Sequence, residues 1–166
     1  MTDIQDLTYL NWSHARNSSG TAGTFLKSQS ISDGKKIYYK LSNFDSEKGI
    51  IGHECVNEII VDRMLTLLGV EHLAYQLIHA NIEIDGKIFE TWVCASEDFK
   101  EIGETKAALD NYYQINAGAG ISHYDFCREN GWQQYIDTML AVDFLILNRD
   151  RHGANIEVLR NARKHS

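Results

Sequence analysis

Alternating apolar and polar residues in the first half of the chain predict β-hairpins. Two Asp-Gly pairs, Asp33-Gly34 and Asp85-Gly86, stand between alternating segments, as in tight hairpin turns. The segments that we expect to be strands are residues 24–27, 36–41, 73–80, 82–84 and 87–94. A further short strand is expected at residues 156–159.

A helical period separates the two hairpins. Apolar residues recur at intervals of three and four from residue 51 to residue 68, and Gly69 follows as a helix stop. The order is then two strands, one helix and three strands. This order predicts a mixed sheet with one helix laid across it.

The pattern changes after residue 95. Residues 96–103 are polar and loop-like, helical spacing begins at Lys106, and residues 116–120 interrupt it as a loop. Ser122 then opens a short helix as a capping residue, and a last helix begins at Gly131-Trp132. The apolar face of that last helix carries Tyr135, Ile136, Met139, Leu140, Phe144 and Leu147.

The patterns divide the chain into two parts. Residues 1–95 are expected to form an α+β unit, and residues 96–166 a mostly helical part. At 166 residues and 43% hydrophobic content, the chain is long and apolar enough for one sizeable domain or a little more.

Charge and cysteine content exclude several function classes. A formal charge of −7 argues against direct nucleic-acid binding, because neutralising phosphates needs clustered Lys and Arg. Cys55, Cys94 and Cys127 form no C-x-x-C pair, so neither a disulfide framework nor a structural zinc site is indicated. The N-terminus does not resemble a signal peptide, and no apolar run approaches the ~18 residues of a membrane span. We therefore expect a cytoplasmic protein without a membrane partner.

One polar cluster, LNRDRHGAN at residues 147–155, follows an apolar run that we expect to be buried, residues 143–147. Such a cluster can be a turn held by Asx hydrogen bonds, or the remnant of a catalytic loop. We favour the catalytic loop. Asp150 and His152 as a metal pair are rejected, because the sequence places no third ligand.

Three stretches, taken in order, resemble HipA-like serine/threonine kinases. They are YYKLS at 38–42, NEIIVDRMLTLLG at 57–69 and DFLILNRDRHGANIEVL at 143–159. The third keeps the order Asp, Asn, Asp, His, Asn of the family's catalytic-loop segment. The resemblance covers residues 17–159 and implies an α+β fold: a protein-kinase-like N-lobe, then the first helices and catalytic loop of a truncated C-lobe.

The resemblance implies roles for four residues of the polar cluster. Asp150 is expected to act as the base that accepts the proton of a substrate hydroxyl. His152 would brace the loop, and Asn148 would hold it through hydrogen bonds. Asn155 is expected to be a magnesium ligand.

In the N-lobe the resemblance implies a nucleotide site for ATP and Mg²⁺. Lys40 would contact the α- and β-phosphates and Glu58 would pair with it, with Glu54 as the fallback partner. Residues 18–24 would cover the phosphates with backbone N–H groups, although they depart from the G-x-G-x-x-G pattern, and residues 95–99 would meet the adenine. The residues assigned to the covering loop are Ser19, Gly20, Thr21 and Gly23.

A kinase of this plan also needs a second metal-holding Asp, yet no Asp follows Asp150 in these 166 residues. We therefore expect a truncated or split kinase that binds nucleotide but does not phosphorylate on its own. One alternative is a non-catalytic interaction module or split-kinase subunit. Another is a phosphate-ligand binder unrelated to kinases.

The partners that these readings imply are a nucleotide and a second polypeptide. The polypeptide could be a chain that supplies the missing C-lobe, an antitoxin-like partner, or another copy of the chain. An antitoxin is implied because HipA-type kinases are commonly the toxin half of toxin–antitoxin pairs. Phe144, Ile146 and Trp132 are apolar residues that the missing part of the C-lobe would cover, so truncation is expected to expose them as a surface that favours association.

Overall fold

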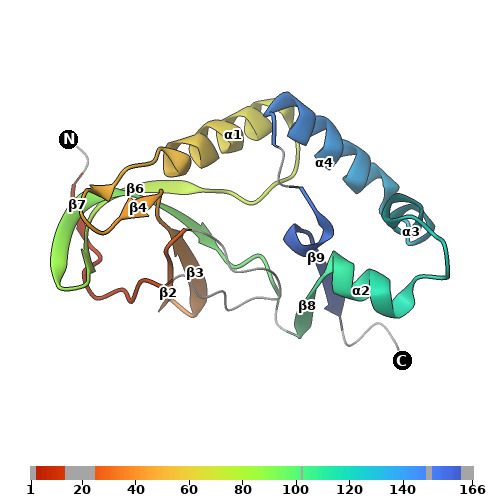
Figure 1. Cartoon of the computed structure of the whole chain (residues 1–166), viewed down its shortest axis with the longest axis horizontal. Helices are drawn as coiled ribbons and strands as arrows, with labels where there is room; N and C mark the ends of the chain where they lie inside the picture. The colour runs from red at the N-terminus through yellow and green to blue at the C-terminus, as the bar shows by residue number, and fades with distance from the viewer. Residues whose placement is uncertain (1–2, 14–24, 102, 149–150, 162–166) are drawn as a thin grey trace. The chain divides into compact units, whose positions relative to one another are not determined.

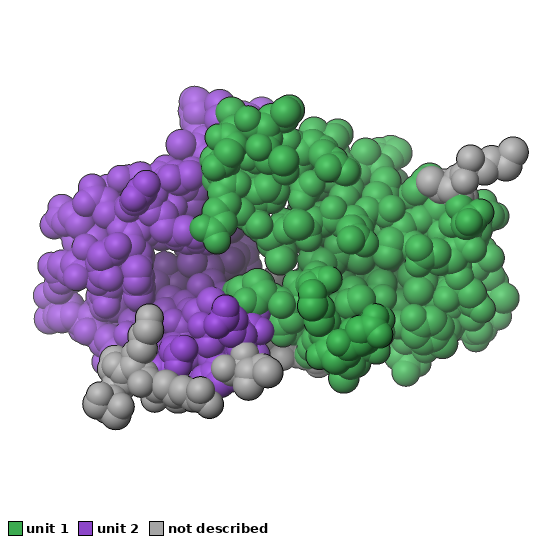
Figure 2. Space-filling model, turned by 180° about the vertical axis from the view of Figure 1, so that it is seen from behind, with its two compact units in different colours: residues 1–16, 22–99 green, residues 17–21, 100–166 purple. Residues whose placement is uncertain are grey.

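The computed structural model describes residues 3–13, 25–101, 103–148 and 151–161 (Figure 1). These residues form two compact units, with the division after Phe99 (Figure 2). Among the described residues, no helix is both long enough and apolar enough to cross a membrane.

The first unit is built on a five-stranded sheet with the strand order β1-β6-β7-β3-β2. Its strands are β1 (Gln5–Asp6), β2 (Lys27–Ser32), β3 (Lys35–Lys40), β6 (Gln76–Ile84) and β7 (Lys87–Glu97). Strand β1 runs parallel to β6, and the other neighbours are antiparallel, so the sheet is mixed, as predicted. A small separate hairpin, β4 (Phe44–Asp45) with β5 (Gly49–Ile50), was not predicted.

Both Asp-Gly turns are present. Asp33 and Gly34 have φ values of 50° and 77°, and Asp85 and Gly86 have φ values of 51° and 75°. Two consecutive positive φ angles give the turn the twist that its flanking strands need, and Asp-Gly adopts them at low cost. These turns bring β2 against β3 and β6 against β7.

One correction concerns the strand after the helix. The sequence predicted separate strands at residues 73–80 and 82–84, but β6 is continuous and pairs with β7 over its whole length. Asn81, which separates the two predicted segments, lies within β6 and pairs with Glu90 of β7. The loop predicted from residue 96 begins later as well, since β7 runs to Glu97.

Helix α1 (Glu54–Leu68) contacts β6 and β7. It was predicted from residue 51 and begins slightly later, but it ends as expected, with Gly69 in the left-handed region at φ 66°. Its buried carboxylate, Asp62, accepts the backbone N–H of Tyr75 at 2.9 Å and lies 3.3 Å from His72 Nε2. These contacts fasten the helix to the segment that leads into β6.

The core of the first unit lies among its strands rather than under the helix. Tyr39, Leu41, Ile82 and Val93 belong to the buried cluster, together with Leu7 from the segment after β1. Only Cys55 and Asp62 of α1 are buried. The sheet therefore has a hydrophobic core of its own, to which α1 contributes little.

The second unit combines a two-stranded sheet with helices. Its elements are β8 (Glu104–Ala108), α2 (Leu109–Asn116), α3 (His123–Glu129), α4 (Gln133–Leu145), the 3₁₀ helix η1 (Gly153–Asn155) and β9 (Glu157–Asn161). Strand β8 pairs antiparallel with β9. The helix predicted from Lys106 was therefore wrong in its first residues, because Lys106 pairs with Leu159 in the sheet.

Helix α3 begins as its sequence predicts, since Ser122 Oγ accepts the backbone N–H of Asp125 at 3.1 Å. The expectation that residues 143–147 are buried was wrong. Asp143 is 5% exposed, whereas Phe144, Leu145 and Leu147 are 80%, 62% and 74% exposed. Successive helical residues point about 100° apart, so turning Asp143 inward turns its apolar neighbours outward.

Candidate functional site

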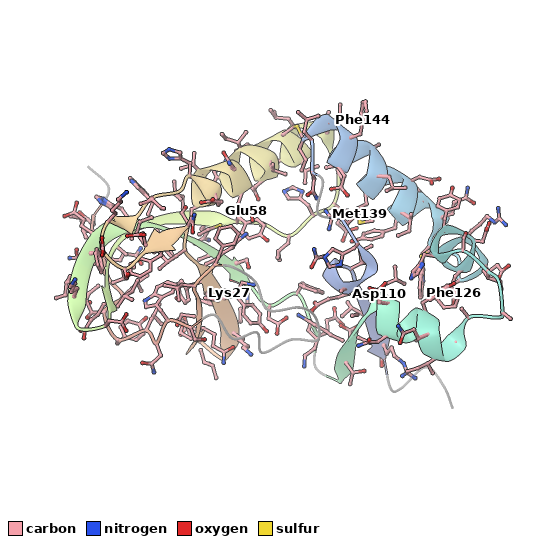
Figure 3. The ribbon with its side chains drawn as sticks, viewed as in Figure 1. Lys27, Glu58, Asp110, Phe126, Met139 and Phe144 are labelled. Atoms are coloured by element: carbon pink, nitrogen blue, oxygen red, sulfur yellow. The ribbon has the colours of Figure 1, made fainter. Side chains whose placement is uncertain are left out.

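Strand β3 and helix α1 of the first unit place a lysine against a glutamate. Lys40 Nζ donates a hydrogen bond to Glu58 Oε1 at 2.5 Å, and each side chain is 30% exposed. Glu58 points from α1 toward the sheet (Figure 3). The predicted pairing of these two residues is thus present as a contact, at a position that solvent can still reach.

The fallback partner, Glu54, is engaged elsewhere. Its Oε2 accepts the backbone N–H of Asn43 at 3.0 Å, so it holds the segment after β3 rather than Lys40. The Phe25 ring lies under the ammonium group, with Lys40 Nζ 5.2 Å from the ring centroid. The lysine head is therefore held by a carboxylate and an aromatic face.

Two buried thiols lie next to Lys40. Cys94 is its partner across β3 and β7, and Cys55 Sγ donates to the Lys40 carbonyl at 3.2 Å. Burial, then Cys55 and Glu58, raises the pKa of Cys94 to about 12. Burial, then Glu58, likewise raises the pKa of the Tyr75 phenol. The Cys94 thiol and the Tyr75 phenol therefore stay neutral at pH 7. The poorly solvated environment that raises their pKa values also strengthens the attraction between Lys40 and Glu58.

The polar cluster of the second unit is organised by Asp143, the first Asp of the segment that resembles a catalytic loop, for which the sequence predicted no role. Arg151 donates to it through a fork, with Nε 2.7 Å from Oδ2 and Nη2 2.8 Å from Oδ1. Asn148 Nδ2 also donates to Oδ1 at 2.8 Å. Asp143 therefore anchors residues on both sides of the segment that carries Asp150.

The pKa of Asp143 reflects two opposing effects. Burial acts to raise it, but the hydrogen bonds from Arg151 and Asn148, with the charge of Arg151, outweigh burial and hold the pKa below its usual range. Asp143 is consequently an anion that is fully paired at pH 7. The signals in the sequence were its place as the first Asp of the resembling segment and its position as a lone acidic residue within the apolar run AVDFLIL.

The backbone at the end of α4 has an unusual conformation. Asn148 N–H donates to the Asp143 carbonyl at 2.8 Å and Leu147 N–H to the Phe144 carbonyl at 3.3 Å, which is the Schellman pattern of a helix end. Leu147 occupies the left-handed position, with φ 55°, where glycine is usual. The turn that opens the polar cluster is thus strained, and Asp143 holds it in place.

The end of the cluster is a tight turn against α2. The backbone N–H of Asn155 donates to the His152 carbonyl at 2.9 Å, which closes η1. At Gly153 a side chain would collide with α2, since an added Cβ would lie 1.9 Å from Asp110 Oδ1. Asp110 Oδ1 in turn lies 3.2 Å from His123 Nε2.

Several predicted site residues are not covered by these contacts. Asp150 and the covering-loop residues Ser19, Gly20, Thr21 and Gly23 lie outside the described residues. Their roles, and those of His152 and Asn155, stay predictions. Lys40 with Glu58 belongs to the first unit, and Asn148 with Asp143 and Arg151 belongs to the second.

The described residues do not form a complete magnesium site by themselves, and the expected role of Asn155 as a ligand stays a prediction. Within the described ranges, no three His, Cys, Asp or Glu residues are grouped so that they could hold a metal ion. Asn155 offers a neutral amide oxygen, and Mg²⁺ favours carboxylates and phosphates. These residues therefore do not fit a metal by themselves.

Comparison with known proteins gives one informative result. No family model matches the sequence, and no curated protein matches it. Among solved structures, the chain is similar to the Helicobacter pylori proinflammatory kinase CtkA, with a TM-score of 0.60 and 17% identity. The chain has a kinase-like fold.

The likeness covers 96% of this chain and 56% of that kinase chain. The chain therefore spans about half the length of the kinase, and it resembles the N-terminal part. At 17% identity the kinase-like fold alone carries over. Substrates, cofactors and partners do not follow from it.

Proposed function

We propose that this chain is the nucleotide-binding portion of a HipA-like protein serine/threonine kinase. In this proposal Lys40 contacts the phosphates of ATP, and Glu58 fixes the position of its ammonium group. The loop of Ser19, Gly20, Thr21 and Gly23 covers the phosphates with backbone N–H groups. Asp150 is the base toward a substrate hydroxyl, and Asn155 helps to hold Mg²⁺.

The single observation that carries the proposal is the ion pair between Lys40 and Glu58 in a kinase-like fold. Lysine binds phosphate through a charge at the end of a long, flexible side chain. A partner that fixes the position of the ammonium group therefore lowers the entropic cost of ordering that side chain when phosphate binds. Lys35 and Glu97 form an ion pair on the same sheet, but their side chains are 67% and 59% exposed. The half-buried pair is the one suited to a ligand site.

The fork between Asp143 and Arg151 supports the proposed roles of Asp150 and Asn155. Phosphoryl transfer depends on positioning the base and the metal ligand relative to the phosphates. Asp143 binds Asn148 before Asp150 and Arg151 after it, so it is placed to restrain the loop from both sides. Asp143 and Arg151 are positioning residues in this proposal.

Calorimetric titration of the full chain with ATP, with and without Mg²⁺, tests the nucleotide site. We expect Lys40→Met to weaken binding by about tenfold or more, which corresponds to about 1.4 kcal/mol. Lys35→Met, on the same strand, should bind ATP like the wild type. Equal affinity of the two variants, or a wild type that does not bind ATP, would refute the site.

The proposal includes binding without turnover by these 166 residues alone. No Asp follows Asp150 here, so charge developing on the transferred phosphoryl group would lack a carboxylate-bound metal. A transfer assay with radiolabelled ATP and excess Mg²⁺ should show no labelled protein. Robust labelling that Asp150→Asn abolishes would show that the chain is an active kinase, and the expectation of inactivity would be wrong.

The second candidate, an interaction module or split-kinase subunit, is favoured by a specific observation. Phe144, Leu145 and Leu147 are large apolar side chains that are more than half exposed at the C-terminal end of α4. Of the other two residues expected on this surface, Ile146 is only partly exposed and Trp132 packs against the buried cluster of the second unit. Such a cluster marks a contact surface in many proteins. An antitoxin-like partner belongs to the same candidate, since toxin–antitoxin kinases act in complexes with their antitoxins.

A further inference from the structure

The ring of His72, between α1 and β6, faces hydrogen-bond acceptors on both of its nitrogens. Nδ1 lies 2.7 Å from the Val70 carbonyl oxygen, which can only accept. Nε2 lies 3.3 Å from Oδ1 of Asp62 and 3.5 Å from Oγ1 of Thr66. The Thr66 hydroxyl donates its own proton to the Asp62 carbonyl at 2.9 Å, so it too is an acceptor toward the ring.

These contacts match one protonation state of the ring. Neutral imidazole has one N–H group and one lone pair, whereas the imidazolium has two N–H groups. In the neutral ring a proton on Nδ1 serves the Val70 carbonyl, but the lone pair of Nε2 then points at the Asp62 carboxylate. In the imidazolium both nitrogens donate, and the contact with Asp62 gains the attraction of opposite charges. The geometry therefore favours the ring that carries both protons.

Burial makes Asp62 dependent on this charge. The Asp62 side chain is 6% exposed, and its Oδ1 accepts the backbone N–H of Tyr75 at 2.9 Å. A buried carboxylate without a counter-charge is costly, even where a neutral group donates to it. The His72 side chain is 17% exposed, so its proton can exchange with water. Loss of that proton would leave the carboxylate with the Tyr75 N–H but without this counter-charge.

Asp62 lies on the side of α1 that faces the sheet, together with Cys55 and Glu58 (Figure 3). Spacings of three and four residues keep these three on one face of the helix. Cys55 attaches the first turn through uncharged contacts, since its backbone N–H donates to the Ser42 hydroxyl and its thiol to the Lys40 carbonyl. Asp62 attaches the second half of the helix through an ionic contact. Glu58 lies between the two attachments, and the second of them depends on a histidine proton.

Tyr75 and Cys94 are further titratable groups that interact electrostatically with Asp62. Burial raises the pKa of the Tyr75 phenol, and it raises the pKa of the Cys94 thiol to about 12, so both are neutral where histidine changes charge. Glu58, which interacts with both of these groups, is the anion of the pair with Lys40. The histidine proton is therefore the switchable charge of this cluster between about pH 5 and 8.

We propose that His72, when it carries both protons, is a pH-sensitive anchor that holds the second half of α1 to the segment before β6. The folded protein offers the two ring nitrogens acceptors in fixed positions, and the unfolded chain does not. The anchor therefore stabilises the protein fully at the acidic end of the range from about pH 5 to 8, and its contribution is lost as pH rises. Its effect on a ligand rests on the proposed nucleotide site: with the anchor released, Glu58 should hold the Lys40 ammonium less firmly toward ATP.

Urea denaturation of the full chain near pH 6 and near pH 8 tests the anchor. Asp62→Asn can still accept the Tyr75 N–H, and its amide N–H group suits a neutral His72 ring, so it removes the anchor without leaving a buried charge. We expect its unfolding constant to exceed that of the wild type about tenfold near pH 6, and about threefold or less near pH 8. Glu83→Gln, at an exposed position of β6, is the control for the loss of one negative charge.

Calorimetric titration with ATP at the same two pH values tests the effect on the nucleotide site. The wild type should bind ATP about threefold more tightly than Asp62→Asn near pH 6, and the two affinities should approach each other near pH 8. The ratio of the two affinities cancels the titration of ATP itself. Glu83→Gln should bind ATP like the wild type at both pH values.

A stability difference between the wild type and Asp62→Asn that is equal near pH 6 and near pH 8 would overturn the anchor. So would a change with pH of the same size in Glu83→Gln. If Asp62→Asn does not fold, ¹⁵N spectra of the wild type decide, because a His72 ring with a proton on Nδ1 alone near pH 6 contradicts the proposal. A stability difference that closes as expected, in a wild type that does not bind ATP, would refute the nucleotide site and support the anchor.

Discussion

Lys40 on β3 and Glu58 on α1 join their side chains at 2.5 Å, and this contact links the helix to the sheet. The pair is 30% exposed on each side, so solvent screens it only in part. Because Lys40 also lies over the Phe25 ring, its head group has little freedom. The pair is therefore expected to stabilise the first unit in addition to any role with a ligand.

The coupling between the two residues can be measured with a double-mutant cycle. We expect Lys40→Met and Glu58→Gln to share an interaction free energy of about 1 kcal/mol in urea denaturation, at the upper end for partly exposed pairs. The equivalent cycle on the exposed pair Lys35 and Glu97 should show no measurable coupling. Equal coupling in the two cycles would mean that burial adds nothing at Lys40.

The buried anion Asp143 predicts a pH dependence of stability. Its folded-state pKa lies below the ordinary carboxyl value, so its stabilising contribution is present above about pH 4 and is lost as pH falls through the folded pKa. We expect Asp143→Asn to lower the free energy of unfolding by about 2–4 kcal/mol at pH 7, because Arg151 would lose its partner. The difference from the wild type should shrink below pH 4.

Thermal melting of both proteins between pH 7 and pH 2 provides the measurement. Glu129→Gln, on the exposed side of α3, serves as the control for the loss of one negative charge. A difference between wild type and Asp143→Asn that stays constant with pH would contradict the account. Arg151→Lys should resemble Asp143→Asn in part, because an ammonium cannot replace the two-pronged fork.

The sequence predicted those parts of the fold that local signals determine. Asp33-Gly34 and Asp85-Gly86 specify their turns through backbone angles that few residues accept, and Gly69 ends α1 for the same reason. The predictions from sequence failed where pairing between segments far apart in the chain determines the secondary structure. Lys106 belongs to β8 because β9, about fifty positions later, supplies a partner strand, and helical spacing alone carries no sign of it.

The candidate site, like the fold, was predicted only in part from the sequence. Glu58 could be selected as the partner of Lys40 because both lie in stretches that resemble a kinase. Asp143 belongs to such a stretch as well, but its role could not be predicted, because that role depends on where Arg151 folds back. The expectation that Phe144 and Leu147 are buried failed because an apolar run was taken as a core segment. The buried member of that run is the carboxylate.

The strained turn at Leu147 predicts that a polar substitution stabilises the protein. Leu147 has φ 55° and a 74% exposed side chain, so it bears the cost of the left-handed region without a compensating burial. Leu147→Asn should raise the free energy of unfolding by about 0.5–1 kcal/mol, because Asn adopts this region more readily. Leu145→Asn, at a helical and similarly exposed position, should give no gain in the same urea titration.

The close approach between Gly153 and Asp110 predicts a clash that can be relieved. An added Cβ at Gly153 would lie 1.9 Å from Asp110 Oδ1 and 2.7 Å from its Cγ, so Gly153→Ala must push the Asp110 side chain away. Asp110 would then lose its contact with His123, whose ring stacks on Tyr113 at 3.8 Å. We expect a loss of about 1–2 kcal/mol in the free energy of unfolding.

Removing the obstructing carboxylate should restore much of that loss. In Asp110→Ala the two atoms nearest to the added Cβ are gone, so Gly153→Ala should cost clearly less in this background than in the wild type. Chemical denaturation of the four proteins gives the coupling between the two sites. Additive effects would place the origin of the cost in the backbone of η1, and the requirement for glycine would then be conformational rather than steric.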